Sequence, residues 1–537
     1  MKRYNCGCEF ETDENDRVVF TVKDIENIRE DCPATWNLFH RGMTRGIFQL
    51  EKNLGRKWSK EIKPNNIDEL GAVISLIRPG CLKAITNGKS MTKWYADRKS
   101  GLAEVEYLHP ALEPILKDTY GVLTYQEQSI KIAKDICGFD LKQADVVRRA
   151  IGKKKADLMA ELKEMFINGA EKTGKVTKEE GEEIFEWIKK SERYSFNKAH
   201  AVGYATIAHW TAYCKVHFPR HFFCSYMQYA ANRTNPQEEI RELINDAHLC
   251  GIEVNSPDFR RLETDFYIDG NSVSFGIGNI KQVGPAVIAK LEALKQEIDL
   301  SFEDMTWTEF LIKVSPTVGK TAVENLIDAG ALDFFGIQRR RMKFEYSKFK
   351  ELTKLELKWS ATQPKQSFSE LLIDLARPKK FGGGAANKNR IEKIQILENS
   401  ISNPPFSLDD SRETIIESED KLLGIAITYT KIDDLENYEP NATCKDIIRG
   451  RAGDVILGVI IEKMRKHTIK KGKNAGCDMA FLTVSDNSGI LDDVVVFSDK
   501  FYDYEHLLVE KNAVIIIGTR SPDKDSICVN KVLQIVE

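Results

Sequence analysis

Hydrophobic residues at helical spacing dominate residues 31–235 of the chain. The clearest run is Leu141, Ala144, Val147, Ile151, Leu158 and Leu162. These intervals of three, four and seven residues predict a helix with one buried stripe, and Asp140, after Gly138 and Phe139, is the expected N-cap. The first half of the chain is therefore predicted to be mostly helical.

The pattern changes to strands in two places. Residues 265–276 alternate between apolar and polar positions, which predicts a short hairpin that turns at Asp269 and Gly270. Short apolar runs follow at 455–461, 479–484, 494–497 and 514–518, with a basic loop between the first two. Several short strands with such a loop are typical of an OB-fold barrel. We therefore predict a multidomain chain that is mainly α and ends in an all-β barrel.

Composition shifts suggest five segments. Residues 1–30 form a lead-in without a core of its own, 31–235 a helical region, 346–440 a polar linker and small connecting region, and 441–537 the barrel. Residues 236–345 contain Gly276, Gly278 and Gly284 before an apolar helix, which is a helix-hairpin-helix signal. The backbone N–H groups of such a turn can hold a DNA phosphate, although an ordinary helix connection remains the alternative.

The most basic stretch is Arg148–Lys155, where five of eight residues are basic: Arg148, Arg149, Lys153, Lys154 and Lys155. On a helix these side chains form two neighbouring rows. Arginine forks and lysine point charges together suit a triphosphate. The alternative is a solvated basic face.

The net charge of the 537 residues is only −3, so nucleic-acid affinity has to come from local patches. One patch is Arg339–Arg341 with Lys343, and the other runs from Arg449 to Lys473. The residues expected to contact DNA are Gly276, Gly278, Lys281, Gly284, Arg339, Arg340, Lys470, Lys471 and Lys473.

Eleven cysteines without a framework indicate reduced thiols in a cytoplasm-like compartment. We find no signal-peptide core and no apolar run long enough for a membrane segment. Cys6 and Cys8 could supply two metal ligands and Cys32 a third, but a second cysteine pair of zinc-site spacing is not evident. The sequence therefore predicts no metal site.

Three motifs carry a resemblance to a known family: Tyr120–Gln128 (YGVLTYQEQ), Ala144–Lys155 (ADVVRRAIGKKK) and Phe196–His200 (FNKAH). They resemble the fingers of the bacterial DNA polymerase III alpha subunit, a C-family polymerase. Collinear matches extend to the end of the chain, at residues 46–51, 76–80, 107–110, 245–257, 275–284, 326–336 and 479–486. The last of these resembles the OB-fold of the family.

The resemblance implies a site for the triphosphate of an incoming deoxynucleotide. It assigns Arg148 and Arg149 to the triphosphate, with Lys153 and Lys154 in support. Further candidates are Arg78, Asn197, Lys198 and His200, although Arg78 could equally form a structural ion pair and His200 could equally be structural.

The palm aspartates of the family have no match in the sequence. Residues 1–30 contain no D-x-D pair in an apolar strand, and the third palm aspartate motif is also missing. Because nucleotidyl transfer needs carboxylates that hold two metal ions, we expect a split polymerase that is inactive alone. A palm-bearing partner chain would hold the Mg²⁺, and residues 1–30 could complete an edge of that palm.

The other expected partners are primer-template DNA, single-stranded template and deoxynucleotides. A sliding clamp is left open, with Gln366–Leu371 as the candidate binding peptide and plain linker as the alternative reading. A split gene suggests a phage or other mobile replicon. Two rival interpretations are a stand-alone DNA-binding accessory protein with non-catalytic fingers and a fragment of a longer reading frame.

Overall fold

A computed structural model of the chain describes residues 2–14, 17–153, 156–191, 194–230, 232–297, 302–362, 367–377, 388–432, 438–520 and 526–535. The chain divides into two compact units, residues 1–218 and 219–537. The helical region was predicted to continue to residue 235. It divides earlier because Phe223 and Met227 of α12 (Pro219–Ala230) pack into the core of the second unit. No described helix is long and apolar enough to cross a membrane.

The first unit begins with short strands and a set of short helices. Its elements before residue 120 are β1 (Lys2–Arg3), β2 (Glu9–Phe10), η1 (Val22–Asn27), α1 (Pro33–His40), α2 (Asn53–Ile62), α3 (Ile67–Leu76), α4 (Pro79–Lys83), β3 (Ile85–Thr86), β4 (Lys89–Ser90), α5 (Met91–Lys99), η2 (Pro110–Leu112), α6 (Glu113–Leu116) and η3 (Lys117–Thr119). The lead-in does not form a core alone, since Cys8, Phe10 and Ile28 pack against Tyr213 of α11 (Lys198–His217).

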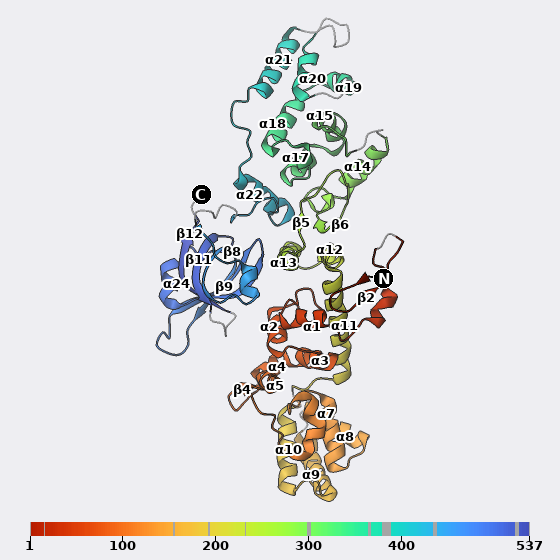
Figure 1. Ribbon diagram of the computed structural model, residues 1–537, viewed down its shortest axis with the longest axis vertical. Helices are drawn as coiled ribbons and strands as arrows, with labels where there is room; N and C mark the ends of the chain where they lie inside the picture. The colour runs from red at the N-terminus through yellow and green to blue at the C-terminus, as the bar shows by residue number, and fades with distance from the viewer. Residues whose placement is uncertain are drawn as a thin grey trace. The chain divides into compact units, whose positions relative to one another are not determined.

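A group of four helices follows (Figure 1): α7 (Gln126–Cys137), α8 (Leu141–Lys153), α9 (Ala156–Thr173) and α10 (Lys178–Ser191). Phe139, Phe166 and Phe185 meet in its core. Asp140 Oδ1 accepts a hydrogen bond from the backbone of Gln143 at 2.7 Å, which confirms the predicted N-cap of α8. α8 ends at Lys153 and α9 begins at Ala156, and the two residues across which one helix was predicted to continue to Leu162 lie outside the described residues.

The second unit opens with a mainly helical body that surrounds a small sheet. Its elements are α12, α13 (Pro236–Leu249), β5 (Val254–Asn255), β6 (Tyr267–Asp269), β7 (Ser272–Ser274), η4 (Ile277–Asn279), α14 (Pro285–Glu297), α15 (Trp307–Glu309), η5 (Phe310–Val314), α16 (Ser315–Val318), α17 (Lys320–Asp328), η6 (Asp333–Phe335) and α18 (Arg339–Phe349). The antiparallel pairing of β6 with β7 confirms the hairpin predicted at Asp269 and Gly270.

The stretch predicted as a linker, 346–440, contains further helices: α19 (Lys354–Ser360), α20 (Phe368–Leu375), α21 (Lys388–Ser402) and α22 (Arg412–Leu423). Phe368, Leu371, Leu372 and Leu375 of α20 are buried in the same core as α13 and α17. The linker prediction is therefore wrong for this part of the chain, because an amphipathic helix face supplies buried surface that a linker lacks.

The chain ends in a closed five-stranded barrel (Figure 1) whose strands follow α23 (Cys444–Ile448). The strands are β8 (Gly453–Thr468), β9 (Asp478–Asp486), β10 (Gly489–Val496), β11 (Ala513–Arg520) and β12 (Ile527–Gln534), with α24 (Ser498–Tyr504) between β10 and β11. The strand order is β10-β12-β11-β8-β9, in which only β10 and β12 run parallel. This is the connectivity of an OB-fold, so the predicted fold class, mainly helical with a terminal barrel, is confirmed.

Candidate nucleotide and DNA interface

A short parallel bridge joins the first and third sequence motifs. The backbone N–H of Gln126 donates to Phe196 O at 2.9 Å, and the N–H of Phe196 donates to Thr124 O at 2.9 Å. The two bonds hold the N-terminal ends of α7 and α11 side by side, although the motifs are about seventy residues apart in the sequence.

Glu127 fixes the start of α11. Its carboxylate accepts hydrogen bonds from Asn197 Nδ2 at 2.7 Å and from the backbone N–H of Lys198 at 2.8 Å. Asn197 Oδ1 in turn caps α11 by accepting from the N–H of His200 at 2.8 Å. The nitrogen and the oxygen of the Asn197 amide thus both form hydrogen bonds within the chain. The residue positions α11, the helix that carries the predicted site residues Lys198 and His200.

Lys198 and His200 lie on the first turn of that helix. Lys198 Nζ pairs with Asp68 at 3.2 Å. The exposed ring of His200 packs between Phe196 and Tyr204, with centroid separations of 5.3 and 4.0 Å. The sequence motif gave no reason to expect this aromatic packing, which orients the imidazole toward solvent at the edge of the site.

Arg78 reaches the same place from the start of α4. Its guanidinium carbon lies 3.6 Å above the centroid of the Phe196 ring, a cation–π contact that the sequence had not predicted. Gly80, two residues on, is required by close packing, because a Cβ there would stand 2.4 Å from Tyr194 Cδ1. The Arg-Pro-Gly turn therefore lies directly against the segment that leads into α11.

The two predicted triphosphate arginines share one carboxylate on α8. Asp145 accepts from Arg148 Nε at 2.9 Å and from Arg149 Nε at 2.6 Å, and the bond from Arg148 lowers the pKa of Asp145. Arg148 also donates from Nη1 to Gln126 Oε1 at 3.4 Å. This contact places Arg148 beside the junction of α7 and α11, while Arg149 is more exposed on the neighbouring position of α8.

The lysines of the same motif are only partly visible. Lys153 is the last residue of α8, and Lys154 lies outside the described residues together with Lys155. Their predicted contacts stay predictions. The structure thus brings Arg78, Arg148 and His200 to one surface around Phe196, a residue that the site prediction had not included.

Two of the three predicted DNA-contacting glycines have an internal reason to be glycine. A Cβ at Gly276 or Gly278 would stand 2.4–2.6 Å from backbone atoms of Thr264 and Asp265. Gly284 differs, because no described atom lies within 4 Å of where its Cβ would be, and α14 begins at the next residue. Lys281, between them, is exposed.

Arg339 is the predicted DNA contact that fits the structure least. Its guanidinium is buried and bonds to Asp333 at 2.6 Å, to Glu419 at 2.8 Å and to Thr428 at 3.0 Å. Burial with carboxylate partners leaves this cation no access to a phosphate, which argues against the predicted contact. The neighbouring Arg340 is exposed, 5.4 Å from the exposed ring of Phe406.

The barrel loop carries the third basic set. Lys470, Lys471 and Lys473 are all exposed between β8 and β9. On the paired strands below the loop, the guanidinium carbon of Arg465 lies 4.9 Å from the ring centroid of Phe481, which is half-buried. Cations beside an accessible ring are the features with which barrels of this kind bind single strands.

The candidate clamp peptide is not an exposed segment. Gln366 lies outside the described residues, while Phe368 and Leu371 are buried in α20. The side chains that a clamp would bind are therefore used by the core, which favours the structural reading of this segment.

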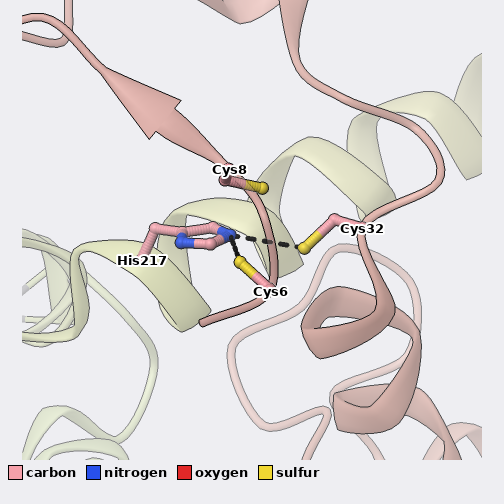
Figure 2. Close-up of side chains that lie close together, drawn as sticks. All are labelled: Cys6, Cys8, Cys32 and His217. Atoms are coloured by element: carbon pink, nitrogen blue, oxygen red, sulfur yellow. Dashed lines mark hydrogen bonds between the residues drawn. The ribbon is translucent and has the colours of Figure 1, made fainter. Parts of the chain in front are cut away.

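One group of metal-ligating side chains stands out within the described residues, and it contains no carboxylate. Cys6, Cys8, Cys32 and His217 converge in the first unit (Figure 2), with their ligand atoms all within 4.8 Å of one another. Burial raises the pKa of Cys32, but hydrogen bonds with His217 and Thr35 lower it to about 6. Burial raises the pKa of Cys8 to about 12. The sequence had not pointed to His217.

Two family models match the chain. The model of the bacterial DNA polymerase III alpha subunit finger domain matches residues 12–174, and that of a helix-hairpin-helix motif matches residues 251–342. The first match contains Arg78, Arg148 and Arg149, and the second contains the glycine turn before α14.

Relatives match between 58% and 95% of the chain. DNA polymerase III subunit alpha of Aquifex aeolicus is 33% identical over 92% of this chain and 38% of its own length. The subunit of Borreliella burgdorferi is 30% identical over 95% and 42%, and that of Caulobacter vibrioides is 37% identical over 58% and 26%. The chain therefore spans about two fifths, or less, of the length of these bacterial relatives. With its finger, helix-hairpin-helix and barrel regions in place, the chain belongs to the DNA polymerase III alpha-subunit family.

Proposed function

We propose that this chain supplies the deoxynucleotide-binding fingers and the DNA-binding parts of a DNA-directed DNA polymerase. The incoming triphosphate would bind Arg148, Arg149 and Arg78 near His200, with Lys153 and Lys154 in support. Primer-template DNA and single-stranded template would bind the second unit.

The observation that carries the proposal is the convergence of four segments of the first unit at the junction of α7 and α11. Arg148 bonds to Gln126, Gln126 bonds to the backbone of Phe196, and Phe196 lies under Arg78. Two guanidiniums are thereby held near one exposed surface of a finger domain. Planar guanidinium forks suit phosphate oxygens, and a charge-assisted bond contributes about 1.5–3 kcal/mol.

The proposed DNA contacts are exposed cations and a stretch of backbone that no described side chain crowds. Gly284 offers an uncrowded approach at the start of α14, next to exposed Lys281. Backbone N–H groups at a helix start can hold a phosphate without reading sequence. Arg340 and the three barrel lysines would extend this sequence-independent grip.

The catalytic carboxylates would come from outside these residues. Among the described residues, the side chains that cluster closely enough to hold a metal ion are cysteines and a histidine, without a carboxylate. Nucleotidyl transfer requires a set of carboxylates that binds Mg²⁺, and the described residues do not supply that set. We propose that a palm-bearing polypeptide supplies the carboxylates and the Mg²⁺. The described residues do not fit that ion, and their proposed part is to bind nucleotide and DNA.

The first test is primer extension by this chain alone and by this chain with the palm-bearing segment of a relative. We expect extension only in the mixture. Arg148→Ala with Arg149→Ala should reduce kcat/KM for the nucleotide by about 10- to 150-fold for each bond lost, which corresponds to the energy of a charge-assisted bond.

The matched control is Lys142→Ala, which removes an exposed cation from the first turn of the same helix. It should leave the nucleotide KM unchanged. Equal effects of the two changes would reject the assigned triphosphate site. DNA binding without extension in any mixture would instead support a stand-alone DNA-binding accessory protein.

A further inference from the structure

The strongest unassigned feature of the molecule is the meeting of three cysteines and one histidine in the first unit. Cys32 Sγ lies 3.4 Å and Cys6 Sγ 3.9 Å from His217 Nε2. Cys8 Sγ is the fourth ligand atom of the group (Figure 2). We propose that Cys6, Cys8, Cys32 and His217 bind one Zn²⁺ ion in a closed structural site.

The distances between the ligand atoms fit a single tetrahedral ion. With Zn–S bonds of about 2.3 Å and Zn–N bonds of about 2.05 Å, tetrahedral angles place sulfur and nitrogen about 3.6 Å apart and two sulfurs about 3.8 Å apart. The observed 3.4 and 3.9 Å lie on either side of the first value. Ligand atoms that all lie within 4.8 Å of one another are close enough to bind a single ion.

The donor set selects the metal. Three thiolates and one imidazole are soft to borderline ligands, and a tetrahedral set of this kind favours Zn²⁺ over the oxygen-seeking Mg²⁺ or Ca²⁺. All four positions are filled by protein, whereas a catalytic zinc keeps one position for water or substrate. The site is therefore structural, and it is distinct from any Mg²⁺ of nucleotidyl transfer.

The backbone near Cys6 and Cys8 is shaped to present both thiols. Gly7 has a φ of +84°, which glycine adopts without strain, and its N–H donates to Tyr4 O at 2.9 Å. The N–H of Tyr4 donates to Cys8 O at 2.9 Å, which closes the turn. Cys32 stands at the N-cap of α1, and His217 is the last residue of α11.

The surroundings exclude water and orient the histidine. Three of the four ligands are buried. The His217 ring packs against Tyr213 at 4.2 Å and against Phe10 at 5.3 Å between centroids. A hydrophobic shell of this kind limits the access of solvent to a metal site.

The ion would join parts of the chain that share little core. Among the described residues, the lead-in contributes Cys8, Phe10 and Ile28 to the buried cluster that it shares with Tyr213, and partly buried residues such as Val18 and Phe20 pack against that cluster. A core of this small size supplies limited stabilisation to a segment of about thirty residues. A zinc ion would fasten them to the C-terminal end of α11, the helix whose first turn carries His200.

The test is the metal content of the full chain, purified without chelator or histidine tag and measured by elemental analysis. We expect about one zinc per chain. Cys6→Ser with Cys8→Ser should lose the ion, whereas Cys477→Ser, which changes a cysteine in the other unit, should retain it. Zinc below about one tenth per chain, or an equal zinc content in all three proteins, would overturn the proposal.

A second readout does not depend on the fold of the double variant. The native chain loaded with Co²⁺ should show the intense visible bands of tetrahedral cobalt and a thiolate-to-cobalt charge-transfer band. His217→Cys should keep four ligands and shift these bands, because sulfur replaces nitrogen. Absence of the bands, or thiols of the cluster found joined in a disulfide, would also reject the site. Neither readout requires polymerase activity, so the zinc site and the proposed function can fail separately.

Discussion

At the residue scale, Gly80 leaves no room for a side chain beside Tyr194, next to the proposed site. A Cβ at Gly80 would lie 2.4 Å from Tyr194 Cδ1, so Gly80→Ala has to push the ring or the Arg-Pro-Gly turn aside. Overpacking of this kind costs about 1–3 kcal/mol. We expect a lower midpoint of thermal unfolding and a higher nucleotide KM, because Arg78 lies two residues away.

Gly203→Ala is the matched control for that change. Gly203 is inside α11, and within the described structure nothing lies within 4 Å of its Cβ position. Alanine there should stabilise the helix by up to about 1 kcal/mol. If both alanines changed stability in the same direction, the close approach at Gly80 would not be the cause.

His209 should make the stability of the first unit depend on pH. Its buried ring packs against Trp36 in a tilted arrangement, and burial lowers the pKa of His209 from 6.5 to about 4. Between these values the unfolded chain binds a proton that the folded chain does not. The contribution of His209 to the free energy of unfolding is therefore fully present above about pH 6.5. It falls as the pH drops toward 4, by about 3 kcal/mol in all.

Urea denaturation of native and His209→Leu chains between pH 7 and pH 4 would check this. The variant keeps every other titrating group, so the difference between the two pH profiles isolates His209. We expect the variant to lose less stability on acidification. Parallel profiles would show that the ring becomes protonated without cost.

Local patterns in the sequence predicted some residues well and others poorly. The N-cap at Asp140 was predicted because capping depends on neighbouring residues alone. Asn197 was assigned to nucleotide, but its amide caps α11 and bonds to Glu127, a partner seventy residues away. His217 was missed because it joins Cys32 across 185 residues, and no spacing rule connects them.

At the element scale, the loop of the β8–β9 hairpin carries three exposed lysines. Replacing Lys470, Lys471 and Lys473 by alanine should weaken binding of single-stranded DNA. It should also reduce the slope of log affinity against log salt by about 2, since each lost phosphate contact contributes about 0.7. Fluorescence anisotropy at several salt concentrations measures both quantities.

Lys354, Lys358 and Lys421 provide the control for that experiment. These lysines are exposed on α19 and α22, and replacing them removes the same formal charge. If binding depends on the local loop, the control triple should keep the salt slope of the native chain. An equal loss would mean that overall charge, rather than the hairpin, attracts the strand.

Helices in the region predicted as a linker show where element prediction failed. Phe368, Leu371, Leu372 and Leu375 follow helical spacing, and Ser367 with Glu370 forms a capping box. These signals were present in the sequence. The linker prediction instead followed the polar, glycine-rich composition of the surrounding residues. That composition is an average over the whole segment and does not apply to the eight residues of α20.

At the scale of the whole molecule, the two units have separate cores. The buried clusters of the first unit draw on residues up to Tyr213, while those of the second begin at Phe223. The units should therefore unfold in separate transitions, and a change confined to one unit should move only its own transition.

Metal removal tests this independence together with the zinc proposal. A ligand present at a hundred times its dissociation constant stabilises the folded form by about 2.7 kcal/mol. For a unit of about 200 residues this corresponds to about 5–10 °C in Tm. We expect a chelator to lower the calorimetric transition of residues 1–218 by this amount and to leave the other transition unchanged. Added Zn²⁺ should restore it, and the Cys6→Ser, Cys8→Ser chain should not respond to either treatment. A shift of both transitions would show that the units are coupled, whereas no shift in a zinc-containing chain would show that the ion does not hold the lead-in to α11.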